Sequence, residues 1–228
     1  MALVKKYKSK VTQINEPIKD VFVVKFEAEK KFKFKPGQFL HLALDEYDPG
    51  MPWPESRCFS MQNHPGEMEV TITFAIKGNY TERMAGELYV GKEVWLKLPY
   101  GSIFTGNFKK ECPVFIAGGT GITPFLSLFT DKEFNEYKNA RLYFGIRKDC
   151  HNLYDDELNK AILHNPDFKI NIINQEKSGI LDIEKIFNEH GKDCSYFISG
   201  PPAMIKDFKN FLIQNGVNGE YVITDDWE

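Results

Sequence analysis

The sequence of 228 residues lacks the long apolar runs that would place it in a membrane. A transmembrane helix needs about 20 consecutive and mostly apolar residues, and no segment approaches that length. The N-terminal segment MALVKKYKSK has a cluster of lysines but no apolar stretch, so it does not have the pattern of a signal peptide. We therefore expect a cytoplasmic protein without a membrane span.

Cysteine is scarce and widely spaced. The four cysteines are Cys58, Cys112, Cys150 and Cys194, and no two stand at the short spacings typical of zinc or iron–sulfur ligands. Because no signal peptide is evident, we expect all four to be free thiols in a reducing compartment. The sequence predicts no metal site.

A strong net charge is also lacking, since the formal net charge at pH 7 is −3. The charge is uneven, because the first 35 residues hold ten lysines and four acidic residues, a balance of +6 that leaves −9 for the rest. Nucleic-acid binding is typical of more basic chains. The basic N-terminal part could dock an acidic partner, but lysines that protect strand edges from aggregation give the same pattern.

The composition that remains is that of an ordinary globular protein, with 42% hydrophobic residues and no repeat or low-complexity tract. The length suits two domains. In the first half, short alternating runs rich in Val, Ile and Phe are separated by Gly and Pro, which predicts an antiparallel barrel or sandwich. From residue 109 onward apolar runs alternate with helical patterns, including a helix over Thr123–Tyr137, which predicts a parallel, doubly wound α/β domain. We place the domains at residues 1–108 and 109–228.

Two glycine-rich segments follow predicted strands in the second half. VFIAGGTGITPF, residues 114–125, is an apolar run that enters a helix through Gly118, Gly119 and Gly121. YFISGPPAM, residues 196–204, stops at Gly-Pro-Pro in the same way. Ligands of open α/β sheets bind at the carboxyl ends of strands, and glycine there allows the backbone to approach a ligand closely. Read alone, each segment is also compatible with an ordinary turn.

Two polar segments stand out in the first half. PESRCFSMQN, residues 54–63, places an arginine, a ring and a hydroxyl side by side in Arg57-Cys58-Phe59-Ser60. FAIKGNYTERM, residues 74–84, has a Gly-Asn turn before a helix that Thr81 could cap. Charge for a phosphate, a face for a ring and a hydrogen-bonding hydroxyl would together suit a flat, phosphate-bearing molecule.

The order of these four segments resembles the ferredoxin–NADP reductase superfamily, the two-domain flavoprotein module of oxygenase reductases and flavin reductases. The resemblance runs from PGQFLHL, residues 36–42, to SGPPAM, residues 199–204, and so covers most of the chain. It implies an N-terminal antiparallel Greek-key β-barrel that binds flavin. It also implies a C-terminal doubly wound parallel α/β domain that binds the nicotinamide dinucleotide.

The resemblance implies flavin-binding roles in the first domain. Arg57 would pair with a flavin phosphate, since a guanidinium binds phosphate in a bidentate way. Phe59 would lie against the isoalloxazine ring in place of the family's usual tyrosine, and Ser60 would act as a catalytic residue that bonds flavin N5. Cys58 belongs to the same motif, but alternation along a strand turns it away from its neighbours. The implied flavin-binding set is Arg57, Cys58, Phe59, Ser60, Phe74, Ala75, Ile76, Lys77, Gly78, Asn79 and Thr81.

The resemblance also implies nicotinamide-binding roles in the second domain. Ser199 stands where most relatives have a cysteine, so a catalytic role of that thiol does not carry over intact. Trp227 is a candidate for an aromatic lid over the flavin, although an acidic terminus such as ITDDWE also frays readily. Both are counted as candidate catalytic residues. The implied cofactor-binding set is Gly118, Gly119, Thr120, Gly121, Thr123, Arg147, Gly200, Pro201 and Met204.

The resemblance implies FAD as the bound flavin, with FMN as the alternative. NADPH users of the family present cationic and hydroxyl groups to the 2′-phosphate, where this chain has NQEKSG, residues 174–179. Glu176 would repel that phosphate, which favours NADH, whereas Lys177 and Arg147 would favour NADPH.

The implied activity is an NAD(P)H-dependent, FAD-containing oxidoreductase that passes electrons to a separate acceptor protein, such as a ferredoxin or an oxygenase component. Two alternatives stay open. One is a reductase that uses free flavin as a substrate, and the other is a nucleotide-binding sensor without turnover. Nothing in the sequence predicts the oligomeric state.

Overall fold

The computed structural model describes residues 3–147 and 152–225. The chain forms two compact units, Met1–Gly101 and Ser102–Glu228, and each has a sheet and core of its own. The residues just after Gly101 pack in the second core through Ile103, Phe104 and Phe108. For that reason the second unit begins before residue 109, where the change of sequence pattern had placed the boundary.

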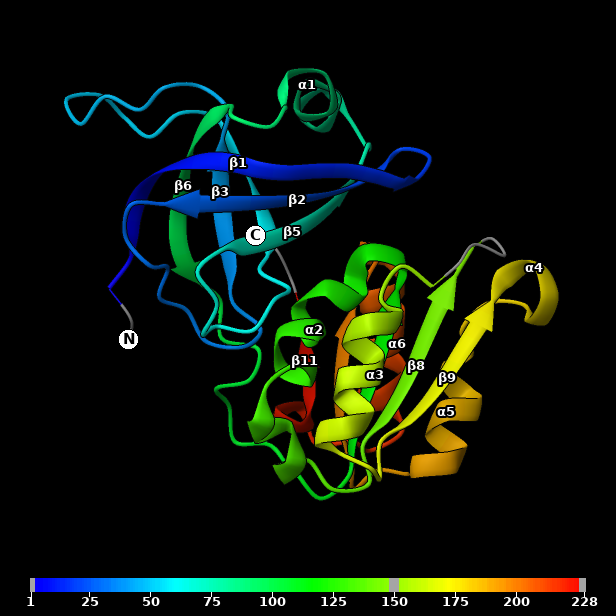
Figure 1. Cartoon of the computed structure of the whole chain (residues 1–228). Coiled ribbons are helices and arrows are strands. Elements are labelled where there is room, and N and C mark those ends of the chain that lie inside the picture. Colours follow the sequence, from blue (N-terminus) through cyan, green and yellow to red (C-terminus); the bar gives the residue numbers. More distant parts are fainter. Residues whose placement is uncertain (1–2, 148–151, 226–228) are drawn as a thin grey trace. The chain divides into compact units, whose positions relative to one another are not determined.

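The first unit is a six-stranded antiparallel sheet with strand order β4-β3-β6-β1-β2-β5 (Figure 1). Alternation builds much of its core, since alternate strand residues face inward and most of these are apolar; in β6 they are Val94, Leu96 and Leu98. Its elements are β1 (Lys5–Ile18), β2 (Val21–Ala28), β3 (Phe39–Ala43), β4 (Ser56–Ser60), β5 (Val70–Ala75), α1 (Asn79–Glu87) and β6 (Glu93–Tyr100).

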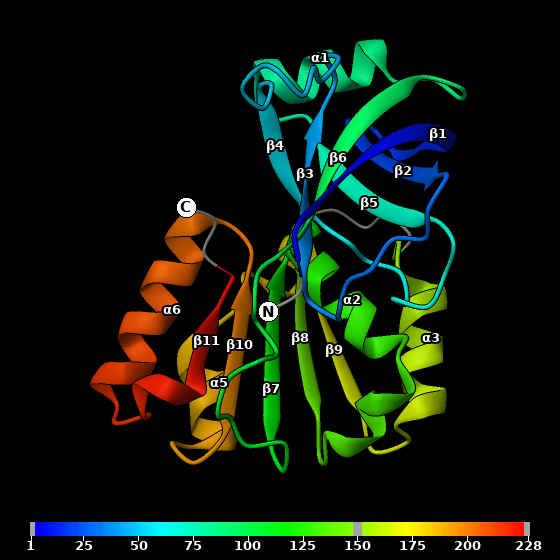
Figure 2. The same ribbon diagram turned by 90° about the vertical axis from the view of Figure 1, so that its left-hand side faces the viewer.

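The second unit is a five-stranded parallel sheet with strand order β11-β10-β7-β8-β9, as Figure 2 shows. Helices α2 and α3 pack on one face, and α5 and α6 pack on the other. Its strands are β7 (Pro113–Gly118), β8 (Arg141–Ile146), β9 (Lys169–Asn174), β10 (Ser195–Ser199) and β11 (Val222–Thr224). Its α-helices are α2 (Thr123–Phe129), α3 (Asp155–His164), α4 (Gln175–Ser178), α5 (Ile183–His190) and α6 (Pro202–Gln214).

These two sheets confirm the predicted fold class. One predicted element is wrong in detail, because the helix expected over residues 123–137 ends at Phe129. Asp131 then accepts a hydrogen bond from the Glu133 N–H at 2.9 Å and starts a separate 3₁₀ turn, Lys132–Glu136. An aspartate that caps a new turn competes with continuation of the helix.

The expectation of four free thiols is also wrong, because Cys112 and Cys194 form a disulfide. Both residues immediately precede strands that pair in parallel, β7 and β10, and the Ser195 N–H donates to the Cys112 carbonyl at 3.2 Å. The two residues stand 82 positions apart in the sequence, and only the strand order brings them together. Cys58 is not part of a disulfide, and Cys150 lies outside the described residues.

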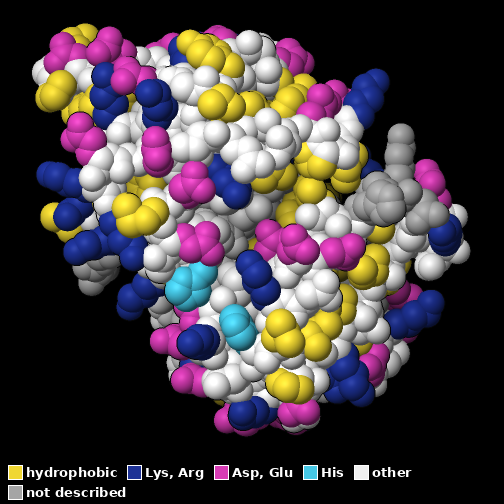
Figure 3. Space-filling view, in the orientation of Figure 1, with side chains coloured by type: hydrophobic (Ala, Val, Ile, Leu, Met, Phe, Trp, Pro, Cys, Tyr) yellow, Lys and Arg dark blue, Asp and Glu magenta, His cyan; other side chains and the backbone are white. Residues whose placement is uncertain are grey.

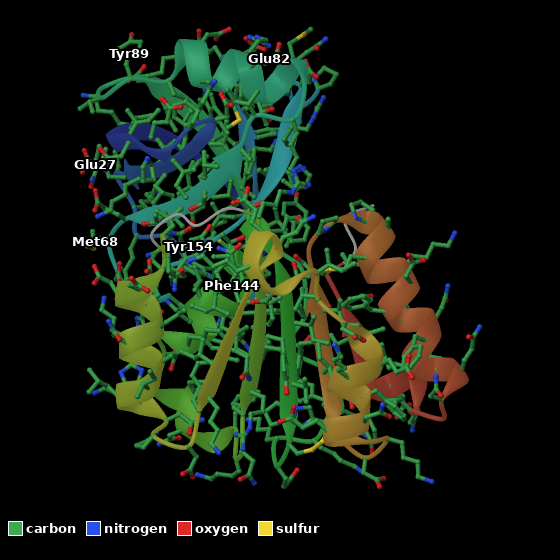
Figure 4. All side chains as sticks on the ribbon, turned by 90° about the vertical axis from the view of Figure 1, so that its right-hand side faces the viewer. Glu27, Met68, Glu82, Tyr89, Phe144 and Tyr154 are labelled. Carbon is green, nitrogen blue, oxygen red and sulfur yellow. A yellow bond between two sulfur atoms is a disulfide. The ribbon has the colours of Figure 1, made fainter. Side chains whose placement is uncertain are left out.

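Near the start of the second described segment, the chain packs against strand β8. The ring of Tyr154, just before α3, lies 6.1 Å from that of Phe144 in β8, and Figure 4 labels both. In the view of Figure 3, basic and acidic side chains are interspersed. None of the helices within the described ranges has the length and apolar character needed to cross a bilayer.

Candidate functional site

Strand β4 presents the Arg57-Cys58-Phe59-Ser60 motif at the edge of the first sheet. Arg57 and Phe59 face the side of Tyr80 and Phe74, whereas Cys58 faces His41 of β3, with its Sγ 3.6 Å from the imidazole nitrogens. This is the alternation that a strand imposes. The structure therefore separates Cys58 from the two side chains predicted to grip a flavin, and the residue cannot share their ligand through its thiol.

The Arg57 guanidinium is half exposed and available to an anion. One arm pairs with the Glu55 carboxylate at 2.9 Å, and the other donates to the Ser56 carbonyl at 2.9 Å. An exposed ion pair of this kind stabilises a fold by about 0–1 kcal/mol, so an anionic phosphate of a flavin cofactor could replace Glu55 at little cost. The geometry suits the phosphate role predicted for Arg57.

The Tyr80 ring holds the Arg57 guanidinium in place, and the sequence motifs did not indicate this role of Tyr80. The Arg57 Cζ lies 4.7 Å from the centre of the Tyr80 ring, in cation–π contact. The Tyr80 hydroxyl donates to the Leu42 carbonyl at 2.7 Å and accepts from the Leu44 N–H at 3.2 Å. Burial raises the pKa of Tyr80 to about 12, so the hydroxyl keeps its proton at physiological pH. Its position between Asn79 and Thr81, in the predicted phosphate loop, could have indicated from the sequence that Tyr80 belongs to the site.

At the start of α1, next to Tyr80 in the sequence, the backbone at Gly78 has open space around it. Gly78 is extended, with φ of 169°, and no heavy atom lies within 4 Å of the place where a Cβ would stand. The Thr81 hydroxyl accepts hydrogen bonds from the N–H groups of Lys77 and Gly78, at 2.8 and 3.1 Å. Thr81 therefore shapes the loop, and Gly78 supplies the room that a phosphate needs.

Other residues of the predicted flavin set belong to the core. The Phe74 ring is buried and stacks on Phe22, with ring centres 5.0 Å apart, and Phe59 packs against Phe74 at 6.1 Å. Only the backbone of Phe74 could touch a cofactor. The Ile76 N–H donates to the Asp20 carbonyl at 2.9 Å, so this donor is already used. Ser60 is buried at the end of β4, and Ala75 ends β5.

In the second unit, the glycines of the two predicted segments interlock. A Cβ on Gly121 would lie 2.5 Å from the Gly200 Cα, and a Cβ on Gly118 would lie 2.9 Å from the Pro201 ring. Real Cβ atoms do not approach so closely, so these two glycines are explained by packing. The segments after β7 and β10 thus form one joined edge of the sheet.

Gly119 differs from its neighbours. It has φ of +56°, which disfavours a side chain, and open space surrounds the position of a Cβ. Thr123 closes the adjoining turn by donating to the Thr120 carbonyl at 2.9 Å. Gly119 is thus the glycine of this segment whose backbone a pyrophosphate could approach directly.

The remaining predicted residues surround this edge or lie outside the described chain. Met204, in the first turn of α6, packs near Gly118, with its Sδ 3.2 Å from the Cβ position. Arg147 is exposed just after β8. Ser199 ends β10 in a buried position. Trp227 lies outside the described residues, so its role as a lid stays a prediction.

The profile of the family described as "oxidoreductase NAD-binding domain" matches residues 115–210, which include both glycine segments of the second unit. The reductase component of propane 2-monooxygenase from Mycolicibacterium smegmatis (strain ATCC 700084 / mc(2)155) is 30% identical over 215 residues, which is 86% of this chain and 59% of the relative. A ferredoxin–NAD(P)⁺ reductase component of naphthalene 1,2-dioxygenase/salicylate 5-hydroxylase systems from Ralstonia sp is 29% identical over 73% of this chain and 49% of its own length.

The profile, the sequence relatives and the fold together support the ferredoxin–NADP reductase superfamily as the group that this chain resembles. A cytochrome P450 reductase from Amycolatopsis superimposes with a TM-score of 0.82 at 17% identity, covering 98% of this chain and 70% of that chain. A ferredoxin NADP⁺ reductase from Neisseria gonorrhoeae with bound FAD and NADP gives 0.76 at 18% identity, covering 95% and 93%. At these identities the likeness shows the fold alone, and it is the two-domain fold that the resemblance implied. The chain spans about three-fifths of the propane 2-monooxygenase reductase component.

Proposed function

We propose that this protein is a flavoprotein oxidoreductase that takes hydride from NADH onto FAD and passes electrons to a separate acceptor protein. The observation that carries the proposal is a pair of open backbone positions at the two predicted phosphate loops. Gly78 is open within the same sheet unit as Arg57, and Gly119 is open at the carboxyl end of β7. Relatives named as reductase components of oxygenase systems support this activity.

The residues present fit a flavin and a dinucleotide. Arg57 would hold a flavin phosphate while Tyr80 keeps its guanidinium in place, and Phe59 would offer a ring face. Gly119 and its neighbours would admit the dinucleotide's pyrophosphate. When bound, these groups supply hydride acceptance and single-electron release, and the protein's task is to bind, orient and shield them.

We infer a preference for NADH from the end of β9. The Asn174 side chain accepts from the Glu176 N–H at 2.9 Å and thereby caps α4, which places an acidic residue in the first turn. A second negative group such as a 2′-phosphate would be repelled by Glu176. Glu176→Gln is expected to raise kcat/KM for NADPH several-fold and to leave that for NADH nearly unchanged. An unaltered NADPH value would remove Glu176 from the specificity site.

The electron acceptor lies outside these 228 residues in the proposal, because their cysteines lack iron–sulfur spacing and two of them are joined in a disulfide. Relatives named as the reductase component or the electron transfer component of dioxygenase systems support an acceptor protein of the ferredoxin or oxygenase class.

Flavin retention and dye reduction together test the proposal. The purified protein should keep FAD through gel filtration, as chromatography of the released cofactor would show, and should reduce ferricyanide with NADH. Protein that loses all its flavin but reduces added flavin would instead be a free-flavin reductase. Protein that binds nucleotides and reduces no dye would be a sensor, and either result would overturn the proposal.

A further inference from the structure

The second sheet has an open edge at β9. This strand stands last in the order β11-β10-β7-β8-β9, and among the described residues β8 is the only strand that pairs with it. It is six residues long, whereas β11 at the other edge has three. An edge strand presents unpaired N–H and C=O groups, and proteins usually shorten, bend or cover such edges. The sequence of β9, KINIIN, has no proline or glycine, and its register with β8 runs without a bulge.

The backbone of β9 turns the polar groups of two isoleucines toward this edge. The Lys169 N–H donates to the Ala140 carbonyl, just before β8, at 3.1 Å. Backbone groups of successive residues point to opposite sides of a strand, so Ile170 and Ile172 direct their N–H and C=O groups away from β8. The described residues outside β8 offer these four groups no backbone partner.

The side chains at this edge are apolar on one face of the sheet. Ile170 packs in the core on the face that α2 and α3 cover, and alternation places Ile172 on the same face, where it is 44% exposed. Helix α3 adds two exposed apolar side chains, Ile162 and Leu163, and Figure 3 shows hydrophobic side chains over this helix. Apolar surface beside unpaired backbone groups favours the addition of a further protein strand.

The strand is complementary to itself in the antiparallel direction. Side chains of directly opposed residues share a face of the sheet, so a two-fold axis at the edge passes through a residue and not between two residues. An axis through Asn171 opposes Ile170 of each copy to Ile172 of the other, and these are the residues with outward N–H and C=O groups. An axis through Ile172 would instead oppose Ile170 to Asn174, a polar residue whose side chain already caps α4.

We propose that the β9 edge binds a second copy of this chain, in antiparallel pairing about a two-fold axis at Asn171. Each opposed pair of Ile170 and Ile172 exchanges two hydrogen bonds, and the pairing joins the five-stranded sheets of the two copies into one continuous sheet. The axis is perpendicular to the sheet, so α3 of both copies lies on the same face. A self-complementary contact of this kind closes as a dimer and leaves no free β9 edge for further chains.

Sedimentation equilibrium of the full chain, from micromolar to millimolar concentration, tests the pairing. The chain has a mass of 26.3 kDa, and the protein should reach twice that mass as the concentration rises. Ile172→Lys should raise the dissociation constant of the dimer at least tenfold, because the lysine enters the contact twice and brings like charges together. Ile213→Lys is the matched control, since Ile213 of α6 is also 44% exposed, and it should leave that constant unchanged. A mass of one chain at every concentration, or equal effects of the two variants, would overturn the proposal.

A cysteine crosslink tests the register of the pairing. The two copies of residue 171 would be directly opposed, with Cα atoms about 4.5 Å apart, a separation that a disulfide bridges. The two copies of Lys169 would be offset by about 13 Å along the strands, beyond the reach of a disulfide. Both positions are exposed, so under mild oxidation Asn171→Cys should form a crosslinked dimer and Lys169→Cys should not. The wild-type protein is the blank for Cys58 and Cys150. Equal crosslinking of the two variants, or none in either, would overturn the proposal.

Discussion

At the scale of single residues, the proposed function makes Arg57 the side chain whose loss should weaken flavin retention most. Charge-assisted hydrogen bonds contribute about 1.5–3 kcal/mol, so Arg57→Ala should weaken flavin binding about 10- to 100-fold. Arg83→Ala is a matched control, because Arg83 lies in the same unit and pairs with Asp45 and Glu87, each at 3.0 Å. Equilibrium dialysis of both variants against FAD measures the effect. Equal affinity in the two variants would contradict the phosphate role.

Tyr80 couples this arginine to the fold. Tyr80→Phe leaves the Leu42 carbonyl and the Leu44 N–H without their buried partner, which should lower the free energy of unfolding by about 1–3 kcal/mol and loosen flavin binding. Thermal unfolding and flavin dialysis of the variant measure both effects. A variant of wild-type stability that retains flavin normally would show that Tyr80 only fills space.

The raised pKa of Tyr80 also makes a prediction about pH. An unfolded tyrosine titrates near pH 10, whereas in the folded protein the pKa of Tyr80 is about 12. The folded state therefore binds more protons between these values, and its contribution to stability is complete below pH 10 and lost as the pH rises to 12. Urea unfolding across this range should show a shallower loss of stability in Tyr80→Phe than in the wild-type protein. Identical slopes would contradict the assignment.

At the scale of elements, the segment after β7 has one glycine that is required for packing, Gly121, and one that we expect to serve binding, Gly119. Gly121→Ala would place a methyl group 2.5 Å from the Gly200 Cα and should strongly destabilise the second unit. Gly119→Ala meets open space and bears only the strain of positive φ, about 1 kcal/mol, yet it should impair NADH binding by filling the approach to the backbone. Calorimetry and NADH titration of the two variants compare these effects. A Gly119→Ala protein with normal NADH affinity would contradict the pyrophosphate role.

A second prediction at this scale concerns the disulfide between Cys112 and Cys194. It joins residues 82 positions apart in the sequence, just before the starts of β7 and β10. Its loss in Cys194→Ala should lower the free energy of unfolding by about 2–4 kcal/mol. Titration of thiols under denaturing conditions should find two more in reduced than in unreduced wild-type protein. Equal thiol counts would show that the two cysteines are unpaired in solution.

These elements also show how far the sequence alone could lead. Alternating strands in the first half and strand–helix alternation in the second predicted both sheets, because these patterns are local. The disulfide of Cys112 and Cys194 depends on the order of parallel strands, which no local pattern encodes. The glycine segment was found from sequence. Only three-dimensional contacts distinguish the packed Gly121 from the open Gly119.

At the scale of the whole molecule, the proposed function needs both units, since the predicted flavin residues lie in the first and the predicted dinucleotide residues in the second. Loss of flavin through Arg57→Ala and loss of NADH binding through Gly119→Ala should therefore each abolish dye reduction. Added FAD at high concentration should restore activity to the first variant and have no effect on the second. Rescue of both by FAD, or of neither, would contradict this division of roles.

The most direct test of the central claim is an anaerobic titration of the purified, flavin-bound protein with NADH. We predict that the visible absorption of the oxidised flavin is lost in full at one equivalent of NADH per flavin, and that NADPH acts much more slowly. An absorption spectrum that stays oxidised with excess NADH and with excess NADPH would contradict the account.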